Sequence, residues 1–147
     1  MESAQSLASR GAGLVGSDGR QPKVAIVGGS PAGAMVATVL CRQFGCTTIH
    51  SPTGDAVLAL LRSNTALDLV VIDLSANGVD GIVALQLIRA LGSRRSLPVV
   101  ALTSGRSDLA GAAGFAGTVA KPYSPRELYH AMQAALDTAS AGAAASA

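Results

Sequence analysis

Three polar residues stand at the ends of short apolar segments that recur along the chain. Asp73 ends one apolar run, Thr103 ends the next, and Lys121 directly follows a third. A carboxylate, a hydroxyl and an ammonium provide a nucleophile, a hydrogen-bond donor and a positive charge. Placed together, they are typical of a site that handles a phosphoryl group.

The apolar segments alternate with helix-like patterns. Strands are expected at Lys23–Gly28, Cys46–His50, Leu69–Asp73, Val99–Thr103 and Thr118–Ala120. Helices are expected at Pro31–Phe44, Gly54–Ser63, Gly81–Leu91 and Pro125–Thr138, with a weaker one near Ser107–Ala113. This alternation predicts an α/β fold with a doubly wound, five-stranded parallel sheet and right-handed crossovers.

Capping residues support these boundaries. Ser30 can cap a helix that has Pro31 in its first position, and Ser124 with Glu127 has the spacing of a capping box. Residues 1–21 are rich in Gly, Ser and Ala without periodicity, so we expect a flexible tail before a domain at 22–139. Residues 140–147 form an Ala-rich C-terminal tail that extends the last helix or frays.

The fold brings the polar residues together. In an open α/β sheet, ligands bind beyond the carboxyl ends of the strands. Asp73, Thr103 and Lys121 therefore project toward one edge, together with Gly28 and Gly29 at the end of the first strand.

In order and spacing these residues resemble the receiver domain of two-component response regulators. The amino-acid sequence of the strand that ends at Thr103 is similar to that of the same strand in receivers attached to hybrid histidine kinases. The resemblance implies a flavodoxin-like (CheY-like) sheet in the order 2-1-3-4-5. It also implies that Asp73 is the phosphoacceptor, that Thr103 donates to the phosphoryl group and that Lys121 is its counter-cation.

The first strand departs from the family pattern. Receivers normally have a pair of acidic residues where Gly28 and Gly29 stand, and the resemblance leaves only Asp73 and the Ser75 carbonyl as magnesium ligands. Magnesium is usually held by one or two carboxylates with waters and phosphate, so we expect weak Mg²⁺ binding at most and no other cofactor. Thr118 stands where receivers carry an aromatic switch residue.

The same glycines allow another interpretation. The segment Gly28–Gly33 is similar to the dinucleotide loop of flavin-dependent oxidoreductases, which brings a pyrophosphate to a helix N-terminus. Neither His50 nor Ser51 supplies the acid expected about 20 residues further on. Binding of a nucleotide or a small anion at this loop stays an alternative.

Composition excludes several classes of protein. The net charge of +2 and an aromatic content of 3% do not favour nucleic acid as a partner. No apolar run reaches the roughly 18 residues of a membrane span, and Cys41 and Cys46 are expected to be buried free thiols. The expected location is the cytoplasm.

The interpretation is a degenerate, non-enzymatic receiver that acts mainly by binding proteins. Its expected partners are a histidine kinase, a phosphotransfer protein or another regulator, and a homodimer is left open. Phosphorylation at Asp73 would be impaired or absent. The alternative is a working phosphoacceptor served by a dedicated donor, because Asp73, Thr103 and Lys121 are all retained.

Overall fold

The chain forms one five-stranded parallel sheet. The computed structural model describes residues 14, 20–51, 59, 62, 66–74, 79–90, 97–103 and 114–146, without side chains at 79–82 and 139–146. The strands are β1 (Lys23–Val27), β2 (Thr47–Ser51), β3 (Leu69–Asp73), β4 (Val99–Thr103) and β5 (Gly117–Ala120). Their order is β2-β1-β3-β4-β5, and every pairing is parallel, which confirms the predicted fold class.

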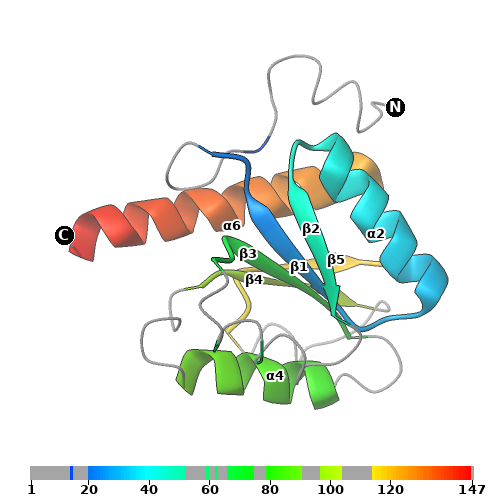
Figure 1. Cartoon of the computed structure of the whole chain (residues 1–147), viewed down its shortest axis with the longest axis horizontal. Helices are drawn as coiled ribbons and strands as arrows, with labels where there is room; N and C mark the ends of the chain where they lie inside the picture. Colours follow the sequence, from blue (N-terminus) through cyan, green and yellow to red (C-terminus); the bar gives the residue numbers. More distant parts are fainter. Residues whose placement is uncertain are drawn as a thin grey trace.

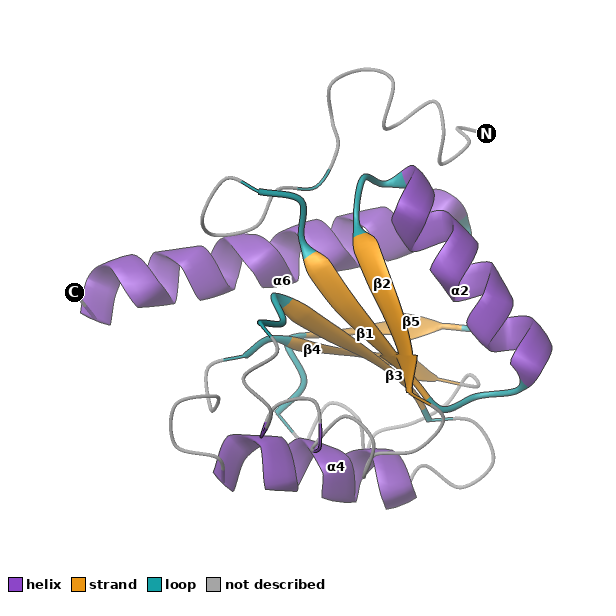
Figure 2. Cartoon of the chain, viewed as in Figure 1, coloured by secondary structure: helices purple, strands orange, loops and turns teal. Residues whose placement is uncertain are grey.

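Helices cover both faces of the sheet (Figures 1 and 2). The described helices are α2 (Pro31–Gln43), α4 (Val79–Ala90) and α6 (Pro125–Ser146). Figure 1 shows α2 and α6 on one face and α4 on the opposite face. In this three-layer arrangement the helices cover the faces of the sheet and leave the ends of the strands uncovered.

Burial follows from this layering. The central strands β3 and β4 are apolar along nearly their whole length because both of their faces are covered. One core cluster joins the sheet to α2 and α6 through residues such as Phe44, Leu128 and Met132. A second cluster joins the other face to α4 through Leu85 and Ile88.

The predicted helix caps are present. Ser30 Oγ accepts a hydrogen bond from the Gly33 N–H at 3.0 Å, and Pro31 follows it at the start of α2. Ser124 and Glu127 form a reciprocal capping box, with both side-chain-to-backbone distances at 3.1 Å. These bonds satisfy N–H groups that a helix start otherwise leaves without partners.

Several element ends differ from the predicted ones. β1 ends at Val27 because Gly28 has a positive φ, and β2 runs from Thr47 to Ser51, one residue later than predicted. α4 begins at Val79, and α6 continues through the Ala-rich segment to Ser146, as expected of alanine, the best helix former.

One predicted helix lies mostly, and another entirely, outside the described residues. Of the helix expected at Gly54–Ser63, the structure describes only Ala59 and Arg62, both helical. The segment Ser107–Ala113 lies entirely outside the described part of the chain.

Within the tail predicted at 1–21, the structure describes Leu14 and residues 20–21, and Leu14 packs against the folded domain. The Leu14 side chain is only 5% exposed and belongs to the core cluster under α2 and α6. Its N–H donates to the Phe44 carbonyl at 2.9 Å. A buried leucine with a satisfied N–H fixes the chain at this residue, so Leu14 belongs to the folded domain.

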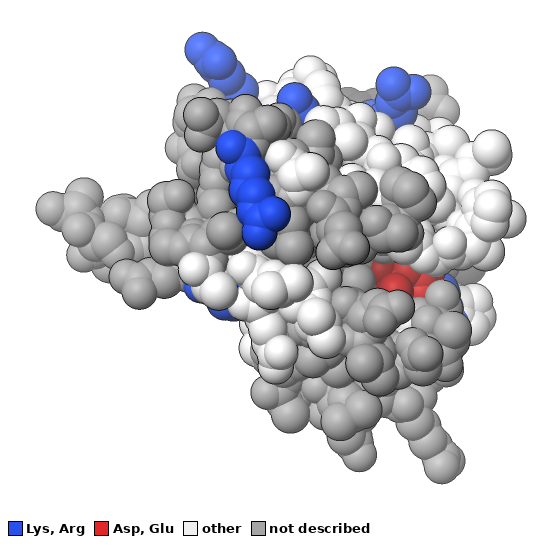
Figure 3. Space-filling model, turned by 60° about the horizontal axis from the view of Figure 1, so that its bottom comes forward, with Lys and Arg blue, Asp and Glu red and all other residues white. Residues whose placement is uncertain are grey.

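Among the residues that the structure describes on the face drawn in Figure 3, the Lys and Arg side chains do not gather into one cluster. Figure 3 shows the described Lys and Arg side chains of one face at separate places, with other residues between them. The Arg89 side chain makes a structural hydrogen bond, in which its Nη1 donates to the Leu97 carbonyl at 2.6 Å. Among the helices that the structure describes, none is long and apolar enough to span a membrane.

Candidate functional site

The site lies at the carboxyl edge of the sheet, where the sequence predicted it. In the register of the strands, Asp73 on β3 is opposite Leu102 on β4, and Thr103 is opposite Ala120 on β5. The Lys121 N–H donates to the Thr103 carbonyl at 2.7 Å. The parallel strands thus carry Asp73, Thr103 and Lys121 to the same edge.

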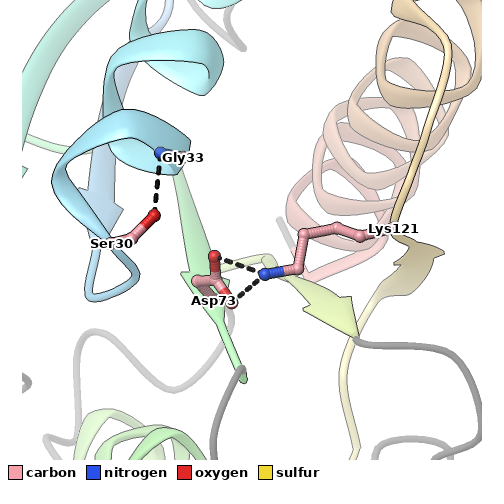
Figure 4. A network of polar contacts seen from close by, with 4 residues as sticks. All are labelled: Ser30, Gly33, Asp73 and Lys121. Carbon is pink, nitrogen blue, oxygen red and sulfur yellow. Dashed lines mark hydrogen bonds and ion pairs between the residues drawn. The ribbon is translucent and has the colours of Figure 1, made fainter.

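Asp73 and Lys121 form a close ion pair. Lys121 Nζ lies 2.8 Å from Asp73 Oδ1 and 2.9 Å from Oδ2, so the ammonium contacts both carboxylate oxygens. The Asp73 side chain is 7% exposed and that of Lys121 29% exposed. Figure 4 shows Asp73 between Lys121 and the start of α2. The two charges neutralise each other where water has limited access.

The glycines at the end of β1 lie against Asp73. Gly28 and Gly29 have φ of +72° and +85°, and the Gly28 N–H donates to the Ser51 carbonyl at 3.0 Å. A β carbon built on Gly29 would lie 2.7 Å from Asp73 Oδ2. The backbone has approached the carboxylate so closely that no side chain fits between them.

The first turn of α2 also faces this carboxylate. A β carbon on Gly33 would lie 3.9 Å from Asp73 Oδ2, and the Gly33 N–H is already bonded to Ser30 (Figure 4). The N-terminus of a helix carries a partial positive charge that stabilises a nearby anion. Asp73 therefore has favourable electrostatic surroundings on two sides, α2 and Lys121.

The residues at this edge do not fit a magnesium ion as they stand. Magnesium requires near-octahedral oxygen coordination, but both Asp73 oxygens contact Lys121 and the Gly29 backbone closes one side of Oδ2. Within the described ranges, no three His, Cys, Asp or Glu side chains gather as a metal site would need. Ser75, the remaining candidate ligand, lies outside the described residues.

Four other polar side chains are not members of the Asp73–Lys121 pair. Thr118 is an exposed residue of β5, the outermost strand on one side of the sheet. His50 is exposed on β2, the outermost strand on the other side. Tyr123 is packed against the core cluster, and burial, with smaller contributions from Cys41 and Asp73, raises its pKa. His130 is exposed on α6, where its ring contacts Tyr129.

Sequence reasoning missed the contact between Gly29 and Asp73. From the sequence, the Gly28-Gly29 pair indicates either a loss of acidic side chains or an anion-binding loop, and neither interpretation includes this contact. The clue was the position of two glycines directly before a helix cap, which is typical of a close approach of the backbone to another group.

Comparisons with known proteins agree with this geometry. Residues 24–133 match the family described as response regulator receiver domain. Sensor protein GacS of Pseudomonas syringae pv. syringae is 34% identical over 88 residues, which are 58% of this chain and 10% of that protein. The chain therefore corresponds to about a tenth of the length of this relative.

Solved structures share the fold. The signal receiver domain of an HD domain-containing protein from Pseudomonas fluorescens Pf-5 superposes with a TM-score of 0.72 at 21% identity, covering 83% of this chain and 99% of that one. Chemotaxis response regulator CheY4 of Vibrio cholerae gives 0.65 at 24% identity, covering 79% and 99%. With the carboxylate, hydroxyl and ammonium at the carboxyl edge of a 2-1-3-4-5 sheet, the chain belongs to the response regulator receiver domain family of two-component signalling systems.

Proposed function

We propose that this receiver acts mainly through protein–protein binding and that metal-dependent phosphorylation at Asp73 is impaired or absent. The observation that carries the proposal is the contact of both Asp73 oxygens with Lys121, with the Gly29 backbone closing the adjacent side. A phosphodonor would have to displace an existing ion pair, without the metal that ordinarily neutralises the transferring group.

The electrostatics of the resting site support this proposal. A site with several acids and one lysine repels itself unless a cation is bound. Here one described carboxylate faces one ammonium, so the pair is close to neutral. Such a site can rest stably with neither a metal nor a phosphoryl group.

The outer face of α2 provides a surface for a partner. Met35, Val36 and Val39 are exposed on this helix, with Met35 68% exposed. The start of the same helix faces Asp73, so a protein that docks on α2 comes close to the site. We propose a helical surface of a histidine kinase or a phosphotransfer protein as the partner, because an apolar helix face packs well against another helix.

Intact-mass spectrometry tests the loss of phosphorylation. The protein is incubated with acetyl phosphate and magnesium beside Asp73→Ala, and we expect both to stay unmodified. Magnesium titration followed by amide NMR should show no saturable binding at magnesium concentrations below several millimolar. A dissociation constant of that size corresponds to a binding free energy of roughly −3 kcal/mol. A stoichiometric phosphoryl adduct that Asp73→Ala abolishes would contradict the proposal.

A second candidate function rests on the retained trio. Asp73 and Lys121 are in contact, and Thr103 lies on the neighbouring strand at the same edge. A dedicated histidine kinase or phosphotransfer protein could supply the electrostatic stabilisation that this chain lacks. Phosphoryl transfer from such a donor, absent with acetyl phosphate, would establish this alternative.

The docking surface has its own test. Met35→Asp and Val39→Asp should weaken capture of a kinase or phosphotransfer protein from extract of the source cells, with unchanged melting because both positions are exposed. Val83→Asp on α4 is the matched control, since Val83 is also an exposed valine on a helix. Equal capture by all variants would place the partner elsewhere.

A further inference from the structure

The loop between β1 and α2 has a backbone conformation that glycine alone adopts readily. Gly28 and Gly29 both lie in the left-handed region, one after the other. Residues with a β carbon visit this region at a cost and seldom twice in succession. The loop therefore differs from an acidic pocket with two side chains removed, because its path depends on glycine.

The two glycines have different surroundings. A β carbon on Gly28 would meet only the Asp73 carbonyl oxygen at 3.5 Å, an ordinary contact. A β carbon on Gly29 would lie 2.7 Å from Asp73 Oδ2 and 3.2 Å from both Cβ and Cγ of that residue. Gly45 and Gly114 also have positive φ, but nothing lies within 4 Å of their built β carbons. Among these four, only Gly29 makes room for the Asp73 carboxylate.

We infer that Gly29 is the positioning residue that keeps Asp73 paired with Lys121. The missing side chain lets the loop close against Oδ2, and the carboxylate then lies between this loop and the Lys121 ammonium. The inference deepens the proposed function, on which it rests, by naming the residue that holds the phosphoacceptor in its neutralised state.

Two consequences follow for what the site can bind. An acid reintroduced at Gly29 would displace the Asp73 carboxylate instead of joining it as a second metal ligand. The space at the start of α2 is also filled by the chain's own anion, since Asp73 Oδ2 lies close to both Gly29 and Gly33. A free phosphate or a nucleotide at Gly28–Gly33 would have to displace Asp73.

A double-mutant cycle tests the contact. Gly29→Ala is combined with Asp73→Ala, and the unfolding equilibrium constant is measured by urea titration without metal. We expect Gly29→Ala to destabilise more than Gly45→Ala, which reports the cost of positive φ alone. The extra destabilisation by Gly29→Ala should be about tenfold in the unfolding equilibrium constant, as is usual for residues in direct contact. It should disappear when Asp73→Ala is also present.

Three outcomes decide the inference. An equal cost of Gly29→Ala with and without the Asp73 carboxylate would overturn it. If Gly29→Ala alone does not fold, recovery of a folded protein by adding Asp73→Ala supports it, and continued failure to fold overturns it. The Gly45→Ala and Asp73→Ala pair should be additive, because nothing contacts the built β carbon of Gly45.

Two spectroscopic measurements separate positioning from stability. In Gly29→Ala the ¹⁵N signal of Lys121 Nζ should move toward its position in Asp73→Ala, whereas Gly45→Ala should leave it unchanged. Gly29→Asp should bind magnesium no more tightly than the wild type, and submillimolar binding would overturn the inference. The cycle uses no phosphodonor and no partner, so its failure is distinguishable from failure of the proposed function.

Discussion

At the scale of single residues, Asp73 and Lys121 each depend on the other. The carboxylate is nearly buried, and the ammonium that contacts both of its oxygens is less than one-third exposed. Removing one member of such a pair leaves the other charge partly desolvated without its partner. Removal of the Asp73 charge should therefore lower the stability of this protein. In a site where several acids repel one another, the same change should raise it.

Asp73→Asn should lower the stability of the protein in metal-free buffer. The amide keeps the size of the side chain but leaves the Lys121 charge uncompensated, at a cost of about 1–3 kcal/mol. Urea unfolding measures the change, with Asp137→Asn on the exposed face of α6 as the control. A higher stability of Asp73→Asn would show that Lys121 does not hold Asp73 and would disprove this account of the site.

The buried thiols provide a pH-dependent contribution to stability. Burial, with a smaller contribution from Asp68, raises the pKa of Cys46 from 9.0 to about 12. Burial, with a smaller contribution from Cys46, also raises the pKa of Cys41. The folded state therefore holds these protons more tightly than the unfolded state. The resulting stability is complete below pH 9.0 and is lost as the pH rises toward the folded pKa.

The free energy of unfolding should fall between about pH 9 and about pH 12 because of these thiols. Urea titrations of the wild type and Cys46→Ala across this range isolate the contribution of Cys46 from that of the tyrosines, whose pKa values are also raised. The wild type should lose more stability than Cys46→Ala. Parallel pH dependence of the two proteins would show that Cys46 ionises equally easily in both states.

At the scale of elements, the helix starts hold the site in place. Ser30 caps α2 at the turn that faces Asp73, and the Ser124–Glu127 capping box begins α6 shortly after Lys121. Each cap supplies hydrogen bonds that the helix itself cannot make. The loop after β5 is therefore fixed at both ends, by the Lys121 N–H bond to Thr103 and by the box.

Ser124→Ala should destabilise the protein by about 0.5–2 kcal/mol, since the Glu127 N–H then loses its acceptor. Thr138→Ala is the control on the same helix, because the Thr138 hydroxyl only bonds back to the Ala134 carbonyl. Such a bond within a helix adds no stability. Equal effects of the two substitutions in urea unfolding would mean that the box contributes nothing.

The sequence predicted elements that have a local signal. The apolar runs of β3 and β4 and the caps at Ser30 and Ser124 repeat patterns that depend on neighbouring residues alone. The closeness of Gly29 to Asp73 has no such signal, because the two residues are far apart in sequence and meet only in the folded sheet. Leu14 was missed for the same reason, since Leu14 and Val15 stand between glycines without any periodicity.

At the scale of the whole molecule, the domain extends beyond its alternating strands and helices. Leu14 joins the core cluster that packs α2 and α6 on the sheet, and its N–H bonds to Phe44 at the end of α2. This attachment lies at the end of α2 away from the start that faces Asp73. Leu14 can therefore stabilise the fold without contacting the ion pair.

Leu14→Ala should lower the free energy of unfolding by about 2–5 kcal/mol, the usual cost of truncating a buried leucine. Leu87→Ala on α4 is the matched control, because Leu87 is 41% exposed and its truncation leaves no enclosed cavity. Urea unfolding compares both variants with the wild type, and the ¹⁵N signal of Lys121 Nζ should stay in place in each. If Leu14→Ala is as stable as Leu87→Ala, Leu14 contributes no more to the core than an exposed leucine does. If Leu14→Ala instead shifts the Lys121 signal, α2 transmits changes from its far end to the site, and the two ends of the domain are coupled.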